Sequence, residues 1–275
     1  MTGSSVETPR PPLELCALTV RQASLPELID VAEGAGYASI TTSPVHVAAS
    51  NTSLSSLRRR CDDAGVAIGY LDGLCSPLPG ITEGVSADIF FEQAEMLGTT
   101  LVNVVHYGGD PTVARTQMAD ALGALADRAA RRGLSLVIEF IPGTAIPDLP
   151  CALELVRTVD RANLRVLLDT WHLGRSGGGP DLVVDDVPAL VGRVQVSDRK
   201  REQDLQPYVP MSGRYLPGRG ELPLAAVLAP VLAANPGMPV GVEVANDELL
   251  AMTSSEAASV AARALRELLD GLAAE

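Results

Sequence analysis

Short apolar runs alternate along the chain with longer segments in which apolar residues recur every three or four positions. The runs have the length of buried strands, and the longer segments have the period of amphipathic helices. The runs predict strands at 13–18, 38–42, 66–71, 100–106, 134–140, 164–169, 193–196 and 239–244. The periodic segments predict helices from residue 24 onward and over 51–64, 86–97, 110–129, 148–160, 184–191, 222–233 and 253–272.

Eight strand–helix units at roughly 30-residue spacing favour an α/β fold, a single (β/α)8 TIM barrel. The rival is an open, doubly wound sheet. Neither GxGxxG nor GxxxxGK[ST] follows the first strand, so the common nucleotide-binding forms of that rival are disfavoured. We therefore expect one TIM-barrel catalytic domain over 12–275, preceded by a flexible N-terminal tail over 1–11. The polar connection 199–220 is expected to cover the mouth of the barrel.

The composition of the chain argues against nucleic acid and membranes as binding partners. Lys and Arg number 21 against 34 Asp and Glu, for a net charge of −13, which argues against a general nucleic-acid binder. The apolar runs are too short to span a membrane, and the N-terminus lacks the apolar region of a secretory signal. The four cysteines are widely spaced, as expected of small core residues in a reducing cytoplasm. We expect a cytoplasmic protein.

Four polar residues follow apolar strand residues in the second half of the chain. They are Glu139, Asp169, Gln195 and Glu243, from predicted strands five to eight. The carboxyl ends of barrel strands meet around one mouth, so these side chains are expected to converge. A divalent metal would relieve the repulsion, and Mn2+, Mg2+ or Co2+ suit these ligands, with Zn2+ also compatible. The alternative is that each carboxylate pairs with an arginine or a backbone amide.

Three motifs carry a resemblance: DTWH at 169–172, RYLPGRGEL at 214–222 and EVAND at 243–247. Over nearly its full length the chain resembles the xylose isomerase-like TIM barrels, the sugar phosphate isomerase/epimerase superfamily. The resemblance implies a divalent metal held by Glu, Asp, His and Glu from strands five to eight. Gln195 departs from this pattern where many members have His, and the resulting set is similar to the 3-dehydroshikimate dehydratase branch. A neutral amide is a poorer donor, so we expect weaker metal binding.

Metal coordination of a carbonyl oxygen and a neighbouring hydroxyl makes the adjacent C–H proton acidic. A base must then take that proton. Its return to another carbon or face gives an isomer or epimer, whereas loss of a β-hydroxyl gives a dehydrated product. The sequence therefore predicts an enzyme that enolises a small polyhydroxylated ketone and isomerises or dehydrates it. An alternative within this chemistry is a 3-dehydroshikimate or inosose dehydratase-type lyase.

His172 is the preferred base, because it follows a predicted ligand by three residues and histidine titrates near neutral pH. The alternative is a histidine that orients a carboxylate. Glu139 and Glu243 could share the base role, as paired glutamates do in the resembling epimerases.

Five further residues are candidates for substrate binding. His106 ends predicted strand four, and the alternative is a structural strand-end histidine; His46 follows strand two. Arg214 aligns with a substrate-loop arginine of the resembling group and could clamp a carboxylate or phosphate. Arg219 could bind substrate in the same way, but a solvent-exposed charge on the loop is the slightly favoured interpretation. Trp171 could wall the mouth or pack.

Two other function classes compete. A nuclease resembling the apurinic endonucleases would need more histidines than the three present, and less negative charge. A non-catalytic binding barrel could keep the same residues, but the intact carboxylates argue against it. We leave a homodimer open.

Overall fold

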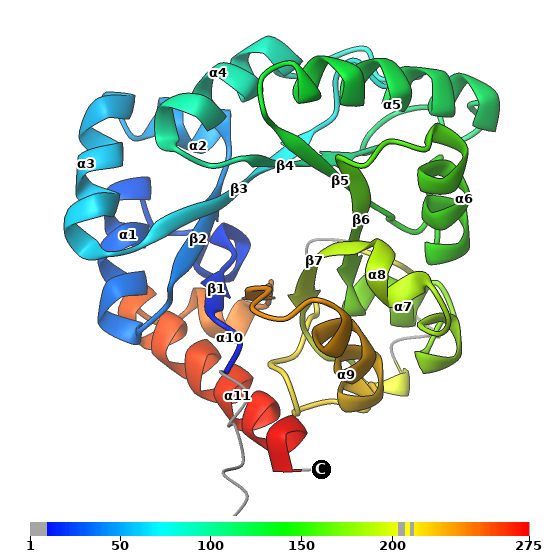
Figure 1. The fold of residues 1–275 in the computed structure, drawn as a ribbon. Helices are drawn as coiled ribbons and strands as arrows, with labels where there is room; N and C mark the ends of the chain where they lie inside the picture. The colour runs from blue at the N-terminus through cyan, green and yellow to red at the C-terminus, as the bar shows by residue number, and fades with distance from the viewer. Residues whose placement is uncertain (1–9, 203–206, 210–211, 275) are drawn as a thin grey trace, which may run out of the picture.

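The computed structural model describes residues 10–202, 207–209 and 212–274, and it confirms the predicted (β/α)8 barrel. Eight parallel strands close in the order β1-β2-β3-β4-β5-β6-β7-β8, and β1 pairs with β8. Figure 1 shows the strands as an inner ring. The strands are β1 Leu13–Leu15, β2 Ser39–Thr42, β3 Ala67–Leu74, β4 Leu101–Val105, β5 Ser135–Glu139, β6 Leu164–Asp169, β7 Val191–Val196 and β8 Val240–Val242.

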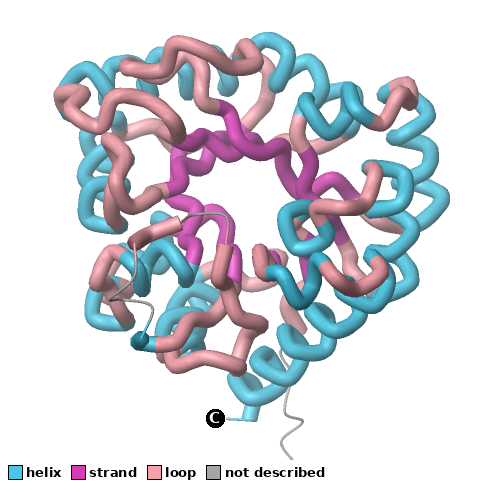
Figure 2. The backbone as a smooth tube through the Cα atoms, turned by 180° about the vertical axis from the view of Figure 1, so that it is seen from behind, coloured by secondary structure: helices cyan, strands magenta, loops and turns pink. Residues whose placement is uncertain are grey.

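The helices form the outer layer, as the view from behind in Figure 2 shows. Apolar faces of these helices pack on the strands, and the last helix, α11, lies against α1. The α-helices are α1 Leu25–Ala35, α2 Pro44–Ala49, α3 Leu54–Ala64, α4 Ala87–Leu97, α5 Arg115–Ala130, α6 Leu149–Val159, α7 Thr170–Arg175, α8 Val187–Leu190, α9 Leu224–Ala234, α10 Asp247–Leu250 and α11 Ser254–Ala274. Two short 3-10 helices are η1 Ala17–Val20 and η2 Pro180–Leu182.

Local sequence signals set most of these boundaries. Ser24 and Ser53 accept hydrogen bonds from backbone N–H groups in the first turns of α1 and α3, as N-cap side chains do. Gly36 ends α1 with a φ of 74°, a left-handed conformation that glycine adopts without steric cost. These signals were readable in the sequence, which is why the predicted helices match the observed ones closely.

Several boundaries differ from the prediction by a few residues. The first strand ends at Leu15 rather than 18, because the Ala17 amide donates to Thr41 Oγ1 at 3.0 Å and the chain turns into η1. β3 continues to Leu74, beyond the predicted end at 71. α5 begins at Arg115, because the Asp110 carboxylate closes a local turn onto Thr112 instead of capping the helix.

The strand register brings the polar strand ends together. Asp169 is the register partner of Gln195, and Glu139 pairs with Leu167, so β5, β6 and β7 end at similar heights. The predicted tail falls mostly on residues 1–9, which lie outside the described residues. The four cysteines are all free. Among the described residues, no helix is long and apolar enough to cross a membrane.

Candidate active site

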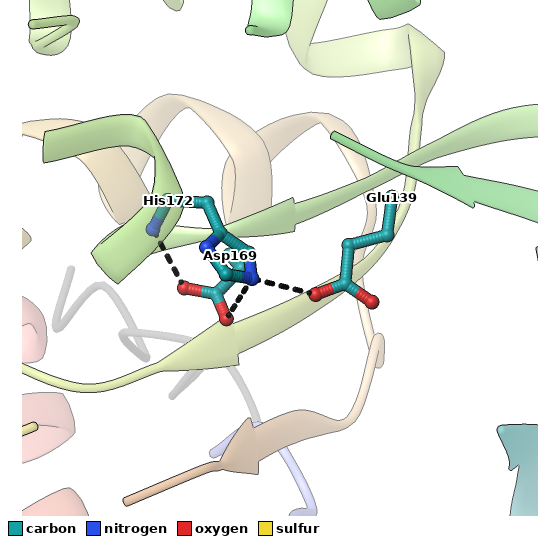
Figure 3. A group of neighbouring side chains, drawn as sticks. All are labelled: Glu139, Asp169 and His172. Carbon is teal, nitrogen blue, oxygen red and sulfur yellow. Dashed lines mark hydrogen bonds and ion pairs between the residues drawn. The ribbon is translucent and has the colours of Figure 1, made fainter. Parts of the chain in front are cut away.

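Asp169 has two distinct roles at the end of β6. Its Oδ1 accepts hydrogen bonds from the backbone amides of Trp171 at 2.6 Å and His172 at 3.1 Å, so it caps α7. Figure 3 shows how this cap turns the His172 ring back over the Asp169 carboxylate and toward Glu139. The DTWH motif therefore builds both a carboxylate and the short helix that carries the histidine.

The cation that meets Asp169 among the described residues is the guanidinium of Arg214. Its Nη1 lies 2.6 Å from Asp169 Oδ2 and 2.9 Å from Glu243 Oε2. The side chain is 2% exposed, and its guanidinium lies 5.9 Å from the centre of the Trp171 ring. Arg214 was predicted to clamp a substrate anion, whereas here it faces two carboxylates. This contact matches the alternative considered for Asp169 and Glu243, pairing with an arginine.

His172 is held on both ring nitrogens. Nδ1 is 2.6 Å from the Tyr208 hydroxyl, and Nε2 is 3.1 Å from Glu139 Oε1 and 3.6 Å from Asp169 Oδ2. Burial lowers the pKa of His172 to about 4, with Arg214 acting in the same direction and Asp169 against it. The imidazole is therefore neutral at pH 7 and able to accept a proton.

Gln195 contacts this cluster through its amide nitrogen and leaves its side-chain oxygen without a partner in the described part of the chain. Its Nε2 donates to the Tyr70 hydroxyl and to Glu243 Oε1, each at 2.9 Å. Its Oε1 is buried without a hydrogen-bond partner among the described residues. A buried acceptor of this kind costs free energy unless a donor or a cation meets it. Gln195 Oε1 is thus suited to bind a metal ion.

Two residues that the sequence prediction missed extend the cluster. Asn103, in the middle of β4, donates from Nδ2 to Glu139 Oε2 at 2.6 Å and to Asp72 Oδ1 at 2.7 Å. Asp72 lies in the part of β3 that continues past the predicted strand end. A polar Asn inside an apolar strand was the available signal for Asn103. Asp72 was missed because the strand was predicted to stop at residue 71.

The carboxylates outnumber the charge that Arg214 brings. Burial raises the pKa values of Glu139 and Glu243 well above the usual range, and neighbouring carboxylates add to this effect. Burial also raises the pKa of Asp72. Asp169 differs, because Arg214 and His172 outweigh its burial and lower its pKa. Among the described residues, four carboxylates share the charge of one guanidinium, so the group is short of positive charge, as expected of a site that binds an additional cation.

The donor set fits a divalent metal. Glu139, Asp169 and His172 each offer one ligand atom, and these atoms lie within 4.8 Å of one another. The unpartnered oxygen of Gln195 adds a neutral donor. Hard oxygen ligands with one imidazole suit Mn2+, Mg2+, Co2+ or Zn2+. Glu243, predicted as a ligand, instead contacts Arg214 and Gln195 in this structure.

A cavity of about 430 Å3 opens above these residues. Glu139, His172, Arg214 and Glu243 line it together with residues from the first four strand ends, including Asp72. This volume is in the range of small-molecule sites. The cavity therefore places titratable groups where a small substrate could reach them.

The other predicted substrate-binding residues have different positions. His46 lines the cavity, with its ring nitrogens 3.2 Å from Ala23 O and 3.4 Å from Thr42 Oγ1. Trp171 is buried against the guanidinium of Arg214, which is the packing alternative.

The structure does not bring His106 or Arg219 to the cavity. His106 is fully buried, with Nε2 3.0 Å from Pro79 O and Nδ1 accepting from the Ala145 amide at 3.3 Å. These contacts match the structural alternative for His106. Arg219 is solvent-exposed and pairs with Glu267 at 3.2 Å, as its interpretation as a surface charge expected.

Known proteins with a similar sequence include proteins that are named as enzymes. A 3-dehydroshikimate dehydratase of Pseudomonas aeruginosa is 30% identical over 238 residues, which are 82% of this chain and 36% of that protein. The chain thus spans about a third of this curated relative's length.

Two solved structures share the fold. The IolI protein, described with a bound zinc atom, superposes with a TM-score of 0.83 at 19% identity, covering 95% of this chain and 99% of that one. L-ribulose 3-epimerase superposes with a TM-score of 0.72 at 16% identity, covering 95% of each chain. The family model described as xylose isomerase-like TIM barrel matches residues 29–269. The chain belongs to the xylose isomerase-like TIM barrel family.

Proposed function

We propose that the protein is a divalent-metal-dependent enzyme that removes a proton beside the carbonyl group of a small polyhydroxylated ketone. One observation carries this proposal. Glu139 and His172 line the cavity, Asp169 is buried beside them, and the three offer ligand atoms within 4.8 Å of one another. Buried carboxylates that exceed their protein counter-charge, beside an open cavity, are the signature of a functional site rather than of a structural ion pair.

The metal would be held by Glu139, Asp169, Gln195 and Glu243, so that His172 stays uncoordinated and can act as the base. When bound, it would polarise the carbonyl and a neighbouring hydroxyl of the substrate and so make the adjacent C–H proton acidic. Gln195 Oε1 is aimed for this role because its Nε2 is fixed by Tyr70 and Glu243. Glu243 would turn from its contact with Arg214 to take part.

His172 would take the proton at Nε2. The Tyr208 hydroxyl oxygen lies 2.6 Å from the opposite nitrogen, so it can accept the Nδ1–H hydrogen bond, which fixes the ring and leaves Nε2 able to take the proton. Glu139 and Glu243 are the alternative bases, because both line the cavity.

The second half of the reaction defines the product. Delivery of the proton to another carbon or face gives an isomer or epimer, and departure of a β-hydroxyl gives a dehydrated product. The dehydratase outcome is favoured by the 30% identity to a 3-dehydroshikimate dehydratase. Both outcomes begin with the same proton removal.

The test is deuterium exchange in D2O. The protein would be loaded separately with Mn2+, Mg2+, Co2+ or Zn2+ and offered ketoses, inososes and 3-dehydroshikimate. We expect deuterium in one of these substrates with at least one metal, and loss of exchange when the metal is chelated. A new ultraviolet band from a conjugated product would identify dehydration, whereas exchange without it would identify isomerisation.

The control is the His172→Gln variant, which keeps a polar side chain but removes the base. We expect it to retain metal and lose exchange. Absence of exchange with all metals and substrates, in a protein that binds metal, would contradict the proposed function and favour a non-catalytic binding barrel.

A further inference from the structure

Asp72 presents a carboxylate oxygen to the cavity that the proposed reaction does not use. Oδ1 accepts a hydrogen bond from Asn103, whereas Oδ2 has no hydrogen-bond partner among the described residues. Asp72 lines the cavity and is partly accessible from it. A carboxylate oxygen with free lone pairs inside a cavity is an acceptor for a ligand hydroxyl and a barrier to a ligand anion.

The orientation of Asp72 is fixed relative to the reaction centre. Asn103 uses its amide group to bridge Asp72 Oδ1 and Glu139 Oε2, at 2.7 and 2.6 Å. This bridge holds Oδ2 at a set position beside the proposed metal ligands. A substrate whose carbonyl lies near Glu139 would therefore place a more distant substituent against Asp72. Burial raises the pKa of Asp72, whereas the hydrogen bond from Asn103 and the charge of Arg214 oppose this effect and favour the anionic form.

The cations that line the cavity offer little to a substrate carboxylate. Arg214 faces Asp169 and Glu243, at 2.6 and 2.9 Å. Arg21 also lines the cavity, but its side chain is 40% exposed and lies 3.9 Å from Asp247. A substrate anion in this cavity would therefore face the Asp72 carboxylate, while both arginines lie beside carboxylates of the protein.

We propose that Asp72 is a specificity-determining residue that selects an uncharged polyhydroxylated ketone over a ketone bearing a carboxylate. Asp72 Oδ2 accepts a hydrogen bond from a substrate hydroxyl and repels a carboxylate at the same position. This inference rests on the proposed function, whose shared first step it leaves unchanged. It separates this chain from its relative named as a 3-dehydroshikimate dehydratase, because 3-dehydroshikimate carries a carboxylate.

The experiment compares wild type with Asp72→Asn on one substrate of each kind. The metal-loaded proteins would be offered 2-keto-myo-inositol, which is uncharged, and 3-dehydroshikimate. We expect wild type to exchange the α-proton of the uncharged ketone with the higher kcat/KM. In Asp72→Asn the ratio of the two kcat/KM values shifts by about ten-fold or more toward the carboxylate substrate, as expected when one like-charge contact is removed.

Asp120→Asn is the matched control, since it makes the same charge change at an exposed position on α5 that does not line the cavity. We expect this control to leave the ratio within about two-fold, which is the scale of a screened surface charge. A wild type that prefers 3-dehydroshikimate, or a ratio that Asp72→Asn does not move, would overturn the proposal. An equal shift in the control would also overturn it, because net charge would then be the cause.

Binding gives a readout that needs no turnover. Calorimetry with the metal-loaded proteins would compare myo-inositol, an uncharged analogue, with quinate, which carries a carboxylate. We expect wild type to favour myo-inositol and Asp72→Asn to raise the relative affinity for quinate. If no substrate exchanges its proton but this preference is found, the proposed function fails and the selection by Asp72 stands. Binding of neither analogue would overturn the selection.

Discussion

The two ends of the barrel interior each contain a buried carboxylate and a buried arginine, but in different proportions. At the amino ends of the strands, Glu14 accepts a hydrogen bond from Ser39 at 2.8 Å and lies 3.5 Å from Arg193 Nε. One carboxylate meets one guanidinium there. At the carboxyl ends, Arg214 pairs with Asp169 and Glu243, and the Glu139 and Asp72 carboxylates belong to the same group. The charges of the pair at the amino ends balance, so we call this the closed end. The carboxylates at the carboxyl ends exceed the charge of Arg214, so we call this the open end, which could accept another cation.

The closed end is also closed in space. Gly69 has room for no side chain, because a Cβ there would lie 1.6 Å from Glu14 Oε2. Arg193 donates to the Gly69 carbonyl at 3.0 Å. The open end has instead a cavity of about 430 Å3. The comparison teaches that a buried ion pair indicates function only where charge is left over and a ligand can reach it.

The largest expected effect comes from removing charge at the open end. Glu243→Gln should lose metal and activity together, with turnover reduced on the order of a thousand-fold, because the transition-state charge loses its stabilisation. Metal content by elemental analysis and the deuterium exchange rate would measure this. Glu248→Gln, an exposed change five residues later, is the control. Retained metal with full turnover in Glu243→Gln would place the cation elsewhere.

Breaking the Glu14–Arg193 pair at the closed end should lower the free energy of unfolding and leave the reaction unchanged. Arg193→Met leaves Glu14 buried without its cation, and we expect the free energy of unfolding to fall by about 3–5 kcal/mol. Denaturant titration would measure the loss. The double variant Glu14→Gln/Arg193→Met should recover part of it, whereas Arg165→Met, at an exposed position on β6, should change little. A loss of metal binding in Arg193→Met at temperatures where it is folded would show that the two ends are coupled.

Removing Arg214 from the open end should increase the affinity of this end for a metal ion. In Arg214→Gln, Asp169 and Glu243 lose their protein counter-charge, so added Mn2+ should stabilise this variant more than wild type. We expect about 1.4 kcal/mol of additional stabilisation, equivalent to ten-fold tighter binding. Thermal unfolding with and without Mn2+ measures it. An equal or smaller metal response would mean that Arg214 and the metal do not compete for the same carboxylates.

The smallest effect is expected at the surface. Arg219→Gln, on the same loop as Arg214, breaks an exposed pair with Glu267, and such pairs contribute about 0–1 kcal/mol. Stability, metal response and exchange should all remain close to wild type. A marked loss of exchange in this variant would restore Arg219 as a substrate-binding candidate.

The sequence predicted the barrel because alternating strands and helices follow from hydrophobic period and capping residues, which are local. It also predicted that Glu139, Asp169, Gln195 and Glu243 would converge, because strand ends of a barrel share one rim. Glu139 and Asp169 do so within 4.8 Å of a shared His172 atom.

The remaining features depend on contacts between distant segments. Arg214 reaches Asp169 across 45 positions of sequence, and no local pattern states how a long loop folds back. His106 acquires its partners from Pro79 and Ala145, 27 and 39 positions away, so its strand-end position alone suggested a pocket residue. Asp72 required a strand end to be placed within a few residues, which is finer than hydrophobic period allows.

The cap on α7 has a consequence for how this site can change. Asp169 divides its two oxygens, one fixing the start of the helix that carries His172 and the other facing the positive charge. Lengthening this side chain by one carbon would shift the helix and the ion together. New chemistry at this rim can therefore arise more readily through Asp72 or Gln195, whose replacement leaves that helix anchored. Asp169 therefore constrains this rim more than Asp72 or Gln195 does, because it also anchors α7.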